Sequence, residues 1–71
     1  MAQPMPTEFE EKLFLNRADI ANRLRALADQ IAQGSLSLGS ARSSVPEQAR
    51  YEVDFEVKPG KGELKIEIEW R

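Results

Sequence analysis

The fold is decided by residues 51–71, which read YEVDFEVKPGKGELKIEIEWR. Apolar and charged residues alternate strictly on both sides of the central Pro-Gly-Lys-Gly, with the two-residue period of half-buried β-strands. We therefore predict an antiparallel hairpin of two amphipathic strands, 51–58 and 63–71. The apolar side chains that face the core are Tyr51, Val53, Phe55, Val57, Leu64, Ile66, Ile68 and Trp70.

The register of this hairpin follows from the parity of its two strands. An even number of unpaired residues in the turn keeps apolar side chains opposite apolar ones, whereas an odd number would set them against charges. A turn of two or four residues is therefore predicted, with Val57 opposite Leu64. The same register pairs Tyr51 with Trp70, and these two aromatic residues are expected to close the core.

The predicted register also arranges the charges on the outer face of the hairpin. It sets Asp54 against Glu67 and Glu52 against Glu69, and like charges directly opposite each other destabilise a sheet. We call these four residues, Glu52, Asp54, Glu67 and Glu69, the acidic band. The acidic band is either a solvated face that prevents aggregation or a binding surface for a basic partner protein. No metal site is expected, because flat strand carboxylates do not wrap around an ion.

An amphipathic helix is predicted before the hairpin. Asn16 is well placed to cap its N-terminus, and Gly34 can end it because glycine adopts a left-handed conformation without steric cost. The apolar residues recur at spacings of four, three and four, which is typical of a helix with one buried face. They are Ile20, Leu24, Leu27 and Ile31.

Two weaker segments lie on either side of the helix. The alternation from Phe9 to Leu15 predicts a half-buried strand, which leaves Phe14 on the opposite face. Phe14 then either packs under a loop or at a sheet edge, or is exposed as a contact residue. Between Ser35 and Val45, the pair Gly39-Ser40 suits the two-residue turn of a short hairpin.

These elements predict one small domain. Residues 1–6 contain two prolines and little that could pack, so they are expected to be a disordered tail. Residues 7–71 are expected to form a single α+β domain, with one amphipathic helix packed on an antiparallel sheet of about four to five strands. The predicted order of elements is β-α-β-β-β-β.

The composition argues against most catalytic chemistry. The 71 residues contain neither cysteine nor histidine, which excludes thiolate nucleophiles, the usual zinc ligands and the commonest general base. We predict that the protein is not an enzyme, with no catalytic residue and no cofactor. A chain this short needs its interior for its own packing, so no small-molecule substrate is expected.

The charge and hydropathy of the chain indicate where it acts. The formal net charge of -2 gives no general attraction to nucleic acid or to an anionic membrane. The apolar runs are far too short to span a bilayer, and the first six residues lack the pattern of a signal peptide. We therefore expect a soluble cytoplasmic protein that binds neither nucleic acid nor membrane.

The sequence also resembles a known family. A short strand, a capped helix ending at Gly34, a weak hairpin and the final alternating strand 63–70 are similar to the amphi-Trp domain family. This is a set of small bacterial and archaeal proteins and domains, and its tryptophan corresponds to Trp70. The resemblance covers nearly the whole chain beyond the first six residues. It implies a compact α+β domain without an established activity, and it transfers no catalytic or ligand-binding residue.

Two functions remain open at this point. The first is a protein-protein interaction module, such as an accessory subunit, that uses the acidic band, an exposed Phe14 or an open sheet edge. The second is a homo-oligomer in which sheet edges pair between chains, as a small core and unpaired edge strands would favour.

Overall fold

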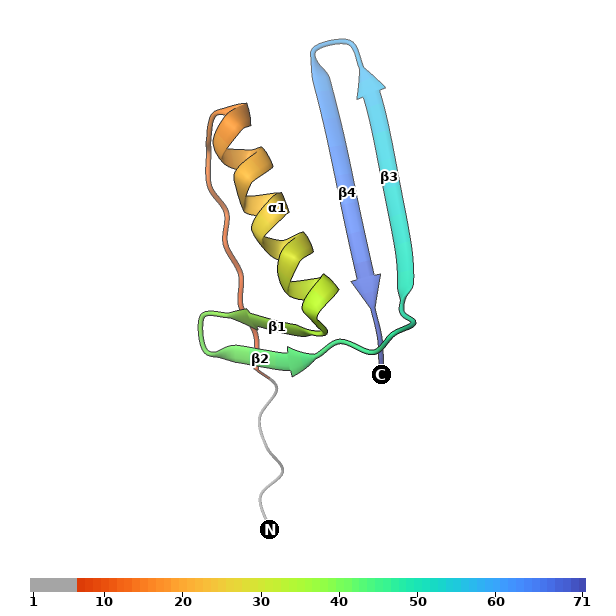
Figure 1. The fold of residues 1–71 in the computed structure, drawn as a ribbon. Helices are drawn as coiled ribbons and strands as arrows, with labels where there is room; N and C mark the ends of the chain where they lie inside the picture. The colour runs from red at the N-terminus through yellow and green to blue at the C-terminus, as the bar shows by residue number, and fades with distance from the viewer. Residues whose placement is uncertain (1–6) are drawn as a thin grey trace.

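The computed structural model describes residues 7–71, and the prediction of a disordered tail at residues 1–6 lies outside this part of the chain. One helix is followed by four strands: α1 (Arg17–Gln33), β1 (Ser35–Leu38), β2 (Ala41–Ser44), β3 (Arg50–Lys58) and β4 (Lys61–Glu69). The strands form two separate antiparallel sheets, β1-β2 and β3-β4 (Figure 1). The predicted α+β class is confirmed, but the prediction of one sheet of four to five strands is wrong for the described residues.

The segment before the helix is not a strand, which corrects the prediction for Phe9 to Leu15. It runs beside α1 without pairing to any described strand (Figure 1). Its side chains contact other elements instead: Arg23 Nη1 donates to Glu11 Oε1 over 2.5 Å, and the ring of Phe9 lies against Gly39. The alternation from Phe9 to Leu15 therefore does not mark a strand in this structure.

Both predicted ends of the helix are confirmed. The side chain of Asn16 accepts a hydrogen bond from the backbone N–H of Asp19 over 2.8 Å, which satisfies one of the free N–H groups of the first turn. At the other end, Gly34 has φ 86° and its N–H donates to the carbonyl groups of Gln30 and Ile31. This left-handed conformation suits glycine and turns the chain directly into β1.

The short hairpin β1-β2 packs at the C-terminal end of α1. Leu38 lies opposite Ala41, so the predicted two-residue turn at Gly39-Ser40 is confirmed. The N–H of Ser37 donates to Gln30 Oε1 over 2.7 Å, which ties the hairpin to the last turns of the helix. Helix α1 and β1-β2 thus form one packed unit.

The long hairpin β3-β4 has the predicted parity but a different register. Its turn is Pro59-Gly60 alone, and Lys58 lies opposite Lys61. Gly60 has φ 77°, which is required by a tight turn with proline before glycine. Residues 61 and 62 therefore join β4, and every predicted pair shifts by two residues.

The long hairpin stands apart from the helix. Figure 1 shows β3-β4 alongside α1, but no Cα atom of either strand comes within 8 Å of a Cα atom of the helix. No side chain of the described residues is fully buried. The radius of gyration is 14.9 Å, whereas a compact domain of this length would have about 11 Å. The single chain is therefore open, and most of its large apolar side chains remain substantially exposed.

Candidate interaction surface

One side of β3-β4 carries apolar side chains that the described chain leaves uncovered. The exposed fraction is 74% for Phe55, 71% for Val57 and 70% for Tyr51, and lower for the others. A sheet face of this composition normally packs against a second layer. We call this surface the apolar face, defined by Tyr51, Val53, Phe55, Val57, Leu64 and Ile66.

The helix has a second uncovered apolar surface. Ile20 and Leu24, in its N-terminal half, are 46% and 44% exposed. Leu27 and Ile31, closer to the end that packs on β1, are half-buried. The apolar side of the helix is therefore only partly covered within one chain.

Phe14 is fully exposed. Of the two alternatives that the sequence left open, the structure places its ring in solvent rather than under a loop. Leu13 beside it is 56% exposed. Single exposed apolar residues are common on protein surfaces, so a role of Phe14 in binding stays a prediction.

The four residues of the acidic band share the outer face of β3-β4, but their cross-strand partners differ from the predicted ones. Glu52 lies opposite Glu67, whereas Asp54 lies opposite Lys65 and Glu69 lies opposite Arg50. The predicted pairs Asp54–Glu67 and Glu52–Glu69 are therefore wrong. Arg50 Nη2 also donates to Glu52 Oε2 over 2.6 Å. Only one like-charged pair, Glu52–Glu67, remains within the acidic band. The role of the acidic band in binding stays a prediction.

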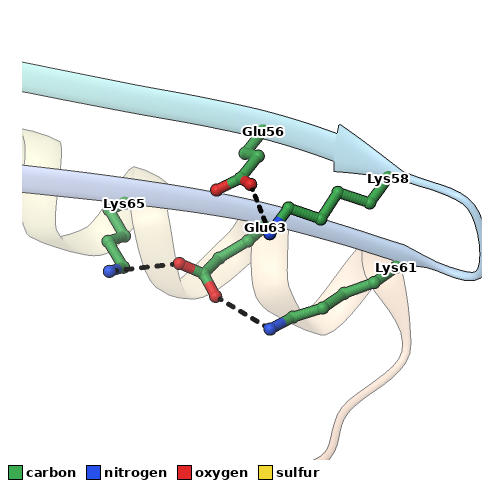
Figure 2. A network of polar contacts seen from close by, with 5 residues as sticks. All are labelled: Glu56, Lys58, Lys61, Glu63 and Lys65. Atoms are coloured by element: carbon green, nitrogen blue, oxygen red, sulfur yellow. Dashed lines mark ion pairs between the residues drawn. The ribbon is translucent and has the colours of Figure 1, made fainter.

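The turn end of the outer face holds a network that the sequence analysis missed. Figure 2 shows Lys58 Nζ 2.9 Å from Glu56 Oε1, while Glu63 is paired with both Lys61 and Lys65, at 3.7 and 3.2 Å. These ion pairs join residues of the same strand and are largely exposed, so each stabilises the hairpin by less than about 1 kcal/mol. The predicted register, with Val57 opposite Leu64, would instead place Lys58 opposite Glu63 and Glu56 opposite Lys65, so it did not indicate these same-strand pairs.

Like charges oppose each other at three positions of this hairpin. The pairs are Glu52–Glu67, Glu56–Glu63 and Lys58–Lys61. Directly opposite like charges destabilise an antiparallel pair, and opposite charges stabilise it by roughly 0.2–1 kcal/mol. The outer face is therefore poorly matched within one chain, although its composition would allow better pairing.

The two aromatic residues predicted to close the core lie apart. Tyr51 is opposite Ile68, not Trp70, and is largely exposed. Trp70 follows the end of β4 and is half-buried, and its Nε1 donates to Ser43 Oγ over 3.3 Å. Trp70 thus connects the base of the long hairpin to β2, and the predicted Tyr51–Trp70 pair is not formed.

Other kinds of site find little support in the described chain. Among residues 7–71, no three acidic side chains are grouped so that they could hold a metal ion. The helix found in this part of the protein is not long and apolar enough to cross a membrane. A shallow depression lies between the segment that precedes α1 and the hairpin β1-β2. It is lined by Thr7, Phe9, Leu36, Leu38, Ala41, Arg42 and Ser43.

Comparison with known proteins identifies the family. Searches of curated proteins and of solved structures give no match. The family model of the Amphi-Trp domain matches residues 3–71, which is nearly the full length. The matched region includes the helix, both hairpins and Trp70. The chain therefore belongs to the Amphi-Trp domain family.

Proposed function

We propose that the protein is a non-catalytic interaction module whose apolar face is completed by another protein chain. One observation carries this proposal: six large apolar side chains on one side of β3-β4 are 41 to 74% exposed. Monomeric proteins rarely expose so continuous an apolar patch, and such patches mark binding sites. The carboxylates along the same hairpin disfavour an anionic lipid surface as the partner.

The total surface of the chain supports an interface of substantial size. The accessible area is 7020 Å² for a mass of 8.0 kDa, whereas a compact folded protein of this mass exposes about 4,500 Å². The difference far exceeds the roughly 800 Å² that each partner contributes to an interface of standard size. An interface that forms together with the final fold would account for an excess of this size.

The energy available from the apolar face supports the same proposal. Full burial of one large apolar side chain is worth about 1.5–3 kcal/mol. Six such residues could therefore contribute an amount comparable to the whole stability of a small domain, which is about 5–15 kcal/mol. A partner that binds this face would therefore also stabilise the folded chain.

Phe55 and Glu56 offer a matched pair for a test, because they are neighbours on β3 whose side chains lie on opposite faces. We expect the wild-type protein to bind the dye ANS at concentrations low enough that each chain is alone in solution. Phe55→Ser should reduce the ANS fluorescence and leave the urea midpoint of the separate chain nearly unchanged. Glu56→Ser should leave the ANS fluorescence unchanged.

The opposite result would overturn the proposal. The proposal fails if the separate wild-type chain binds no ANS. If Phe55→Ser also lowers its free energy of unfolding by about 3 kcal/mol or more, Phe55 belongs to a core closed within one chain.

A further inference from the structure

We infer that the chain which completes the apolar face is a second copy of this protein, joined through the free edges of the two β4 strands. This inference rests on the proposed function and names its partner. In the described residues, β4 is paired with β3 on one side and with no strand on the other. A free strand edge is a template for pairing with another chain.

Each like-charged pair of the long hairpin has one member on β3 and one on β4, so the pairs alone do not select an edge. On β4 the members are Lys61, Glu63 and Glu67. A strand added beside β4 would place new side chains next to these residues on the same face. It could therefore supply the opposite charges that β3 does not supply.

A dimer whose two-fold axis passes through Leu64 would bring opposite charges next to these residues. Two antiparallel β4 strands related by this axis bring Leu64 opposite the same residue of the other copy. Lys61 then lies opposite the partner's Glu67, and Glu63 lies opposite the partner's Lys65. Because the axis repeats each pair, every charged residue from 61 to 67 meets an opposite charge. A symmetric dimer requires such a self-complementary surface.

Neighbouring registers lack this property. A two-fold axis at Lys65 would oppose that residue to itself and Glu63 to Glu67, and an axis at Ile66 would oppose Glu63 to Glu69. Registers in which the numbers of two opposing residues add up to an odd value would set apolar side chains against charges. The pattern of β4 therefore selects Leu64 as the centre.

The edge of β3 does not offer the same match. A two-fold axis at Asp54 would oppose that residue to itself and Glu52 to Glu56. An axis at Phe55 would oppose Asp54 to Glu56, and one at Val53 would oppose Glu52 to Asp54. In each case two carboxylates meet, which disfavours pairing.

The resulting assembly explains the open shape of the single chain. It contains a four-stranded antiparallel sheet in the order β3-β4-β4-β3, with the two apolar faces side by side. Strands lie about 4.8 Å apart in a sheet, so such a sheet is about 15–20 Å wide. Two α1 helices, each about 10 Å in diameter, match this width. Edge pairing widens the apolar face without covering it, so the inference also requires Ile20 and Leu24 of the two helices to pack on this face in the dimer.

Charge reversal on β4 tests this arrangement. Within one hairpin, Lys61→Glu removes the like-charged pair with Lys58, and Glu67→Lys removes the pair with Glu52. Across the proposed two-fold axis, each change has the opposite effect, because it places like charges opposite each other twice. We expect each single variant to raise the dimer dissociation constant about tenfold. The double variant, which exchanges the two charges, should return to within about twofold of the wild type.

Lys58→Glu is the matched control. It removes the same Lys58–Lys61 pair but changes β3, which lies away from the proposed contact. Its dissociation constant should stay within about twofold of the wild type. The dissociation constants are measured by sedimentation equilibrium of the purified full chain.

The outcomes separate this inference from the proposed function. A dimer whose affinity responds equally to Lys58→Glu and Lys61→Glu, or to neither, would overturn the β4 contact. A chain that remains a monomer at its highest attainable concentration and still binds ANS would overturn the second copy as partner, while the proposed function would stand. A monomer that binds no ANS would overturn both.

Discussion

The indole nitrogen of Trp70 donates a hydrogen bond to the hydroxyl oxygen of Ser43 over 3.3 Å, which joins the end of β4 to β2. The bond is long and exposed, so the packing of the ring should matter more. We predict that Trp70→Ala lowers the free energy of unfolding by about 3 kcal/mol and Ser43→Ala by only about 0.5–1 kcal/mol. Urea unfolding followed by far-UV circular dichroism measures both, and equal losses would contradict this assignment.

The contact between Phe9 and Gly39 gives a second prediction. A Cβ atom on Gly39 would lie 2.8 Å from Cδ2 of the Phe9 ring, and the residue has φ 59°. Gly60 also has a positive φ but no atom within 4 Å of such a Cβ. We expect Gly60→Ala to cost about 1–2 kcal/mol from backbone strain. Gly39→Ala should cost about 1 kcal/mol more because of the added crowding.

A double-mutant cycle isolates the contribution of the ring. In a Phe9→Ala background, Gly39→Ala should cost no more than Gly60→Ala, because only the backbone strain remains. If the extra cost of Gly39→Ala persisted without Phe9, the segment before α1 would not lie against the β1-β2 turn. Thermal unfolding of the four variants gives the required differences.

The helix cap gives a third prediction. Asn16 Oδ1 accepts from the N–H of Asp19, so Asn16→Ala should lower stability by about 1 kcal/mol. Asn22 is the control, since its side chain only accepts from Arg25 on the exposed helix surface. Asn22→Ala should be neutral or slightly stabilising, because alanine has the higher helix propensity. Equal destabilisation by the two substitutions in urea would contradict the capping role.

The sequence predicted local features well where a short-range rule determines them. The helix ends at Asn16 and Gly34 follow from capping chemistry, and the two faces of the long hairpin follow from the two-residue period. The register could not be deduced in the same way, because turns of two and four residues preserve the same parity. The structure distinguishes them: Pro59-Gly60 forms a two-residue turn with Gly60 at φ 77°, and Lys61 and Gly62 pair within the strand.

The packing between elements was less predictable. Alternation shows that the hairpin face with Phe55 and Ile66 is apolar, but it does not show which element packs on that face. The assumption that all strands join beneath one helix led to the wrong prediction of one sheet. The pattern from Phe9 to Leu15 failed for a related reason, because alternation alone does not say whether a segment finds a strand to pair with. The members of the acidic band were identified from composition and parity, whereas their partners depended on the register.

The most direct test of the account is amide hydrogen exchange along β4 in the purified chain. In an antiparallel strand, alternate N–H groups point toward one neighbour, so every second amide of β4 points away from β3. If a second copy pairs with this edge around Leu64, both sets of β4 amides should exchange slowly. The outward set of β3 should exchange fast. Fast exchange of the outward amides of β4, at a concentration where the chain is fully associated, would contradict the proposed pairing.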